Sequence, residues 1–235
     1  MSSERASDRP ADDRPGGAGP SGTGPGGTPD GGGRARAERA LLADLLAAAG
    51  PDRPTLCAGW TTHDLAAHLV TRERSPLAGP GLVIPALHGI TERAERSTGQ
   101  SHPFTELVEL FRNGPAWWNP ARLRRFDDAT NVAEFYVHHA DVDRAVPGFT
   151  PRALDPVSRE RIWSGLRLLA RAGYRSTDAE VVAERTDTGA RRVLRRGKST
   201  VVIAGPPEEL LLHAFGRRSV AQVELSGDPA AIASL

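Results

Sequence analysis

The stretch NVAEFYVHHADVDR, residues 131–144, predicts the helix around which the rest of the chain is arranged. It contains no Gly or Pro, and its apolar residues recur at helical spacing. At about 100° per residue, Glu134, His138 and Asp141 fall on one stripe of this helix. His139 lies about 140° around the axis from Glu134 by the same geometry. We therefore expect Glu134 and His138 to reach one metal ion, and His139 to be the poorer ligand.

Taken alone, a Glu-x-x-x-His pair more often marks a solvated polar face than a metal site. The stretch PTLCAGWTTHDLAAHLV, residues 54–70, makes the metal site the better interpretation, because it supplies a further histidine. Thr61 and Asp64 have the spacing of a capping pair, which predicts a helix from about residue 62 to 74. His68 shares the apolar face of that helix with Leu65 and Leu69, so it points inward. A single inward histidine is more often a satisfied core residue than a ligand, but three such groups together predict a metal site.

Composition excludes several classes of protein. The net charge of the 235 residues is +1, which argues against nucleic acid or anionic lipid as a partner. Cys57 is the one cysteine, so an internal disulfide and a cysteine-rich zinc module are excluded. No apolar run is long enough to span a membrane, and the N-terminus lacks the apolar segment of a signal peptide. We expect a cytoplasmic protein that is a monomer or a weak dimer.

The chain divides into three parts. Residues 1–33 have no periodic apolar residues and predict a disordered tail. Residues 34–150 predict a helical bundle with the metal site in its core. Its expected helices lie at about residues 34–49, 62–74, 82–96, 104–111 and 131–144, and Trp117 and Trp118 in a connecting loop are expected to cover the core.

Residues 151–235 predict a small α+β domain with its connecting helix. Strands joined mostly by hairpins are expected, with turns at Asp187-Thr188-Gly189 and Gly197-Lys198 and helices on one side. Asp228 is expected to cap a final helical turn. The expected helices are 156–172 and one opened by Gly205-Pro206-Pro207, and the expected strands are 179–184, 191–195, 200–204 and 220–225.

Three short patterns resemble a known family, the mycothiol-dependent maleylpyruvate isomerases of actinobacteria. They are Cys57-x-Gly59-Trp60, Asp64-Leu65-x-x-His68-Leu69 and Glu134-x-x-x-His138-x-x-Asp141. This part resembles the metal-binding domain of that family, which is a DinB-like four-helix bundle. Residues 201–235, with Glu209-Leu210, Gly216-Arg217 and Gly227-Asp228, are similar to its C-terminal domain, which is like sterol carrier proteins. The resemblance runs from about Arg36 to the end, and most members have no assigned substrate.

The resemblance implies that His68, Glu134 and His138 are zinc ligands. It also points to Arg217 as a catalytic group, with Arg218 as the alternative and an unpaired surface arginine as the competing interpretation. The reaction it implies is addition of a zinc-activated mycothiol thiolate to an activated double bond, followed by rotation and elimination. Related members are expected to transfer the thiol to other electrophiles.

Two imidazoles and one carboxylate leave a fourth coordination position open, which is the catalytic zinc pattern. The leading hypothesis is therefore a zinc enzyme using a low-molecular-weight thiol, although the same ion could activate water. The alternatives are a metal that only stabilises the bundle, or a small-ligand carrier acting through the C-terminal domain. Cys57 is interpreted as a small buried residue rather than a nucleophile. Asp141 either orients a ligand histidine or faces water.

Overall fold

The computed structural model describes residues 31–74, 88–114 and 124–235. The predicted tail up to residue 30, the first part of the helix predicted at 82–96, and the Trp117–Trp118 loop lie outside these residues. No helix among the described residues combines the length and apolar character needed to cross a membrane.

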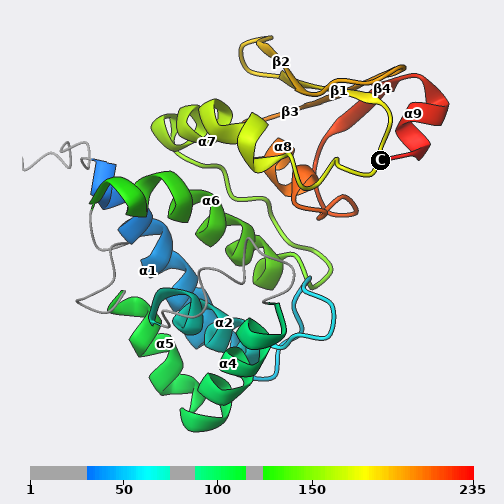
Figure 1. Cartoon of the computed structure of the whole chain (residues 1–235). Coiled ribbons are helices and arrows are strands. Elements are labelled where there is room, and N and C mark those ends of the chain that lie inside the picture. The colour runs from blue at the N-terminus through cyan, green and yellow to red at the C-terminus, as the bar shows by residue number, and fades with distance from the viewer. Residues whose placement is uncertain (1–30, 75–87, 115–123) are drawn as a thin grey trace, which may run out of the picture.

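The N-terminal part consists of helices packed side by side (Figure 1). Its elements are α1 (Gly31–Ala49), α2 (Thr62–Arg74), α4 (His88–Ser101), α5 (Phe104–Arg112) and α6 (Arg124–Asp143). Helix α1 packs along α6 and α5, while α2 packs against α4 and α5. Helix α1 begins at Gly31, so residues 31–33 are helical and not part of the predicted tail. Helix α6 covers the predicted 131–144 helix up to Asp143 and begins earlier, at Arg124, and α4 runs past residue 96 to Ser101.

The start of α2 follows from its capping residues. The Asp64 carboxylate accepts hydrogen bonds from the backbone N–H and the hydroxyl of Thr61, both at 2.9 Å. The backbone N–H of Asp64 donates to the Thr61 hydroxyl at 3.4 Å, which completes the predicted capping box. The preceding loop is tied to the end of α6, because Leu56 N–H donates to the carbonyl of Asp141 at 2.9 Å. This bond places Cys57 beside α6.

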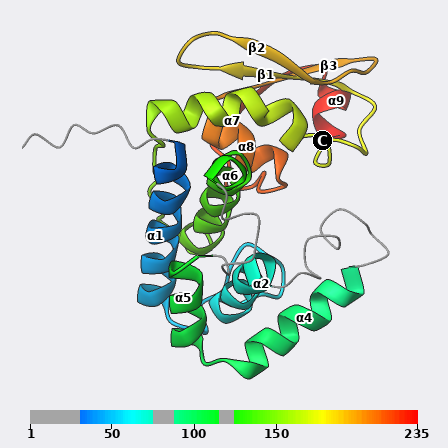
Figure 2. The ribbon, with the colours of Figure 1, turned by 60° about the vertical axis from the view of Figure 1, so that its left-hand side comes forward.

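The C-terminal part is a four-stranded sheet with helices packed on it (Figure 2). Its elements are α7 (Pro156–Leu169), β1 (Glu180–Arg185), β2 (Arg191–Arg195), β3 (Thr200–Gly205), α8 (Pro207–Ala214), β4 (Glu224–Gly227) and α9 (Pro229–Ala233). The strand order is β2-β1-β3-β4. Figure 2 shows α7 and α8 between the sheet and the N-terminal helices. Asp228 caps α9 as predicted, accepting from the N–H groups of Ala230 and Ala231.

The expectation that hairpins join most strands is wrong at one connection. β1 and β2 form the predicted antiparallel hairpin, but β3 pairs with β1 in parallel, so the chain crosses from β2 over the start of β1. Gly197 lies at this crossing, where an added Cβ would approach the carbonyl carbon of Ala179 to 2.1 Å. A glycine is therefore required for close backbone approach and not for a hairpin turn.

The last strand also begins later than predicted, at Glu224 instead of residue 220. The reason is a turn in the preceding segment. The backbone N–H groups of Val220 and Ala221 both donate to the carbonyl of Arg217, at 3.2 and 3.0 Å. These groups are therefore unavailable for pairing with β3.

Helix α6 contributes to two hydrophobic cores. Phe135 and Val142 pack into the core of the N-terminal helices, while Tyr136 and Val137 pack into the core beneath the sheet. The end of α6 is joined to α8 by a buried ion pair, in which Arg144 donates to both carboxylate oxygens of Glu209 at 2.5 and 2.8 Å. The polar stripe of α6 that remains carries the candidate site.

Candidate metal centre

Three side chains from α2 and α6 converge on one point. The Nε2 atom of His138 lies 3.2 Å from Glu134 Oε1, and the Nε2 atom of His68 lies 3.8 Å from the same oxygen. Their possible ligand atoms all lie within 4.8 Å of one another. The two imidazole rings meet edge to face, with centroids 5.3 Å apart. The structure thus brings together the three residues that the sequence pattern selected.

The helices explain why these side chains are presented inward. Leu65 and Leu69, on the same face of α2 as His68, are fully buried in the core of the N-terminal helices. His68 and His138 are themselves only 8% exposed. Burying two imidazoles beside a carboxylate is favourable only where each finds a polar partner or an ion.

The ring of His138 is fixed by Asp141, one turn further along α6. The Nδ1 atom of His138 lies 2.9 Å from Asp141 Oδ2, which leaves Nε2 facing Glu134. Asp141 is completely buried, so it does not face water. Its second partner comes from the C-terminal part, since Arg217 donates to both of its carboxylate oxygens at 2.8 and 2.6 Å. The predicted arginine therefore reaches the site through Asp141.

The ring of His68 is fixed by a residue that the sequence did not single out. Glu95 of α4 places its Oε1 atom 2.7 Å from His68 Nδ1, so Nε2 again faces Glu134. Glu95 lies among several charged residues of α4, and no local pattern shows which of them faces α2. Arg72 was also missed: its Nε lies 3.4 Å from Glu134 Oε1, and its Nη1 donates to Asn131 at 2.8 Å.

These side chains form a network of charged groups. Burial by itself would raise the pKa of Glu134, but hydrogen bonds with His138 and His68 hold that pKa well below its usual range. Burial by itself would lower the pKa of His138, but hydrogen bonds with Asp141, Cys57 and Glu134 raise it well above normal. Burial opposes ionisation of Asp141 too, yet His138 and Arg217 lower its pKa to about 2. A divalent cation would replace the imidazolium proton that balances these carboxylates.

A second possible ligand group, Cys57, His138 and Asp141, overlaps the first. Both oxygens of Asp141 already accept hydrogen bonds from the guanidinium of Arg217. A cation bound there would lie beside that positive charge, which is unfavourable. Glu134 also has an arginine nearby, but Arg72 Nε lies 3.4 Å from its Oε1, farther than the 2.8 and 2.6 Å contacts of Arg217 with Asp141. The group formed by His68, Glu134 and His138 is therefore the better cation site.

Cys57 is half-buried, contrary to the expectation of a buried small residue. Its Sγ lies 3.3 Å from Asp141 Oδ2 and 3.5 Å from Arg217 Nη2. The loop that carries it lies over the end of α6, so the thiol faces the junction with the C-terminal part. There it lines a cavity of about 360 Å³ together with Arg217, Phe215 and Ser219.

The two alternative residues lie elsewhere. His139 belongs to neither ligand group found among the described residues, and burial together with the charge of Arg152 lowers its pKa to about 4. Arg218 donates to the carbonyl of Gly173 at 3.0 Å, and its guanidinium lies 5.9 Å from the ring centroid of Tyr174. Arg217 is therefore the arginine of this pair that contacts the site.

Two solved structures share this fold. A crystal structure of the mycothiol-dependent maleylpyruvate isomerase aligns with a TM-score of 0.57 at 17% identity, covering 83% of this chain and 91% of that chain. A histidine-to-alanine mutant of the mycothiol-dependent maleylpyruvate isomerase aligns with a TM-score of 0.51 at 15% identity, with the same coverage. No protein-family model and no curated protein matches the sequence. At these identities the likeness establishes the fold alone, and it agrees with the predicted α+β class.

Proposed function

We propose that this protein is a zinc-dependent enzyme that uses a low-molecular-weight thiol, mycothiol, to isomerise or modify an electrophilic small molecule. His68, Glu134 and His138 would hold the metal. One observation carries the proposal: both imidazoles present Nε2 to the same Glu134 oxygen, while each Nδ1 is already bonded to a carboxylate. Metal-binding histidines in proteins are commonly oriented in this way.

The spacing of the donor atoms fits a tetrahedral ion. With zinc–ligand distances near 2.0–2.1 Å, neighbouring ligand atoms of a tetrahedral site are about 3.3 Å apart. In the structure, the distance from Nε2 to Glu134 Oε1 is 3.2 Å for His138 and 3.8 Å for His68. Two nitrogens and one oxygen are a common donor set for catalytic zinc.

A zinc ion with three protein ligands keeps one position for an outside molecule and strongly favours the deprotonated form of a thiol. The protein residues supply the rest. Glu95 and Asp141 orient the imidazoles, and Arg217 neutralises the buried charge of Asp141. Arg217 also lines the 360 Å³ cavity, which none of the three ligands lines and which adjoins His138 only through Asp141. We propose that a carbonyl or carboxylate of the electrophile meets the Arg217 guanidinium there. This placement is the basis for proposing Arg217 as a catalytic residue.

The other hypotheses have less support. A purely structural zinc usually has four protein ligands, but each ligand group among the described residues contains three. A carrier function would favour a ligand space near α8, yet every residue of that helix is buried and its leucines belong to the core beneath the sheet.

The test combines metal analysis with a search for activity. We expect the purified protein to bind one zinc per chain, and to modify electrophiles such as activated cis double bonds only when mycothiol is supplied. His68→Ala and His138→Ala should each abolish stoichiometric zinc, whereas His139→Ala should retain it and serves as the matched control. Glu134→Gln should weaken zinc binding. Loss of zinc in His139→Ala with retention in His138→Ala would contradict the proposed ligand set, and activity without added thiol would contradict the proposed reaction.

A further inference from the structure

We infer that Glu95 is a positioning residue for the metal centre: its carboxylate fixes the His68 ring so that Nε2 is the atom presented to the metal. The inference rests on the proposed function, because it concerns the same zinc site. It adds a residue from α4, a helix that supplies no ligand to that site.

The contact is direct, and both side chains are mostly buried. Glu95 Oε1 lies 2.7 Å from His68 Nδ1, and the two side chains are 15% and 10% exposed. When zinc occupies Nε2, the ring carries its remaining proton on Nδ1 and donates it to this carboxylate. A hydrogen bond to a charged acceptor is stronger than one to a neutral group, and it fixes the rotation of the ring as well as the site of the proton.

Close packing of α4 on α2 sets the position of Glu95. The hydroxyl of Thr71 donates to that of Thr98 at 2.9 Å, one turn from the Glu95 contact. A Cβ added at Gly99 would lie 3.2 Å from Cε1 of His63, so the two helices nearly touch at that end. The α4 backbone can shift little relative to α2, which holds Glu95 in front of His68.

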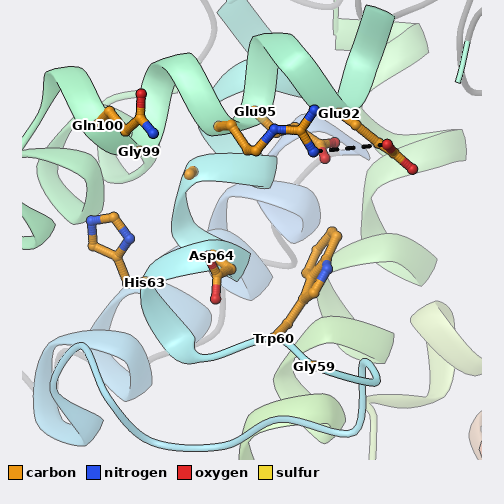
Figure 3. A pocket seen from close by; sticks show the side chains of 10 residues that line it. Gly59, Trp60, His63, Asp64, Glu92, Glu95, Gly99 and Gln100 are labelled. Atoms are coloured by element: carbon orange, nitrogen blue, oxygen red, sulfur yellow. Dashed lines mark ion pairs between the residues drawn. The ribbon is translucent and has the colours of Figure 1, made fainter. Parts of the chain in front are cut away.

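The ring of His68 also packs against an aromatic ring. The Trp60 ring lies 5.1 Å away between centroids, tilted by 52°. Figure 3 shows Trp60 rising from the loop before α2 toward α4, where Glu92 and Glu95 are found. These side chains line a cavity of about 520 Å³ between α2 and α4. Glu95 can therefore be replaced at the wall of a cavity, without disturbing the hydrophobic core.

Glu92 supplies a matched control. It lies one turn before Glu95 on α4 and lines the same cavity, but its carboxylate pairs with Arg96 at 3.8 Å (Figure 3). Its side chain is 64% exposed, and this ion pair joins two residues of α4. Replacing Glu92 removes the same charge from the cavity without removing the contact with His68.

The experiment measures zinc affinity by competition with a chelating dye in the wild type, Glu95→Leu, Glu95→Gln and Glu92→Gln. Loss of such a contact typically weakens metal binding about 10–100-fold, and we expect Glu95→Leu to fall in this range. Glu95→Gln should lose less, because its amide oxygen still accepts the Nδ1 proton. Glu92→Gln should stay within about twofold of the wild type, since surface charges contribute little.

A second measurement distinguishes a change in how His68 binds zinc from a general loss of structure. In the zinc-loaded wild type, the ring nitrogen chemical shifts of His68 should show coordination through Nε2. Substitution of cobalt for zinc should give a visible spectrum that changes in Glu95→Leu and not in Glu92→Gln. Glu95→Gln provides the test if Glu95→Leu fails to fold.

Three outcomes would overturn the inference. They are unchanged zinc affinity in both Glu95 variants, coordination of His68 through Nδ1, and complete loss of zinc in Glu95→Gln, which would make Glu95 a ligand. A wild-type protein that binds no zinc would overturn the proposed function itself, so the two failures are distinguishable.

Discussion

The two histidines of the candidate centre are held by carboxylates in very different surroundings. Asp141, behind His138, is fully buried and bonded to Arg217 from the C-terminal part of the chain. Glu95, behind His68, is 15% exposed and lines a cavity between two N-terminal helices. The position of the Asp141 carboxylate therefore depends on how the C-terminal part packs on α6. The position of the Glu95 carboxylate depends only on α4.

This difference teaches that one site can combine a side sealed from water, at Asp141, with a side that water can reach, at Glu95. On the Asp141 side, loss of a partner leaves a buried charge unpaired, which costs folding free energy. On the Glu95 side, water in the cavity can solvate a group that loses its partner. Substitutions on the two sides should therefore differ in their effects on stability and on metal affinity.

The largest effect is expected where the C-terminal part is anchored to α6. Glu209→Ala removes the partner of Arg144, and the two side chains are 4% and 2% exposed. An unpaired buried charge costs about 3–5 kcal/mol, so urea unfolding should show a loss of this size. Zinc affinity should fall as well, because Asp141 depends on Arg217 from the C-terminal part.

The matched control is the exposed pair Arg191–Glu184, at 2.7 Å. Its side chains are 63% and 27% exposed, and Glu184→Ala should change stability by no more than about 1 kcal/mol. Equal losses in Glu184→Ala and Glu209→Ala would contradict the special role of the buried pair.

Acid should weaken the same side of the molecule through His213 of α8. Its Nδ1 lies 2.8 Å from the Tyr174 hydroxyl, and burial together with the charge of Arg218 lowers its pKa to about 4. In the unfolded chain this pKa is about 6.5, so the unfolded state binds the proton first as pH falls. The stability contributed by neutral His213 is complete above pH 6.5 and is lost between about pH 6.5 and 4. The loss amounts to about 3 kcal/mol.

Chemical denaturation of the wild type and His213→Gln at several pH values tests this expectation. The variant should lose less stability on acidification than the wild type. It should keep part of the dependence, because the pKa of His139 is also lowered to about 4. Identical pH profiles for the two proteins would count against His213 as a source of acid sensitivity.

A direct comparison of the two carboxylates uses Asp141→Asn and Glu95→Gln. Asp141→Asn should weaken zinc binding about 10–100-fold and should also lower stability, because Arg217 loses its charged partner. Glu95→Gln should weaken zinc binding with little effect on stability. Zinc competition and urea unfolding of both variants measure the difference, and equal destabilisation by the two would remove the distinction between the sides.

The smallest effect is expected at the N-terminus. Residues 1–30 contain no periodic apolar residues, so deleting them should leave the melting temperature within about 2 °C and the zinc content unchanged. A clearly lower melting temperature would show that this segment stabilises the fold.

The sequence by itself determined the features that depend on neighbours a few residues away. The helical periodicity of the 131–144 stretch predicted a helix there, with Glu134 and His138 on one face of it. The capping pair Thr61 and Asp64 predicted where α2 begins. The apolar face of α2 predicted that His68 points inward. Helical periodicity and caps act within one or two turns, so they leave a readable local pattern.

Only the tertiary structure decided which distant segments meet. Glu92 and Glu95 are both acidic residues of one polar helix, and the packing of α4 on α2 alone selects Glu95 as the partner of His68. The same holds for Arg217, whose contact with Asp141 depends on the seating of the C-terminal part on α6. The parallel pairing of β1 with β3 also has no local sequence pattern that predicts it, because it depends on which strands lie next to each other in the folded chain. Contacts between distant segments arise from packing of whole faces, which no short stretch of sequence encodes.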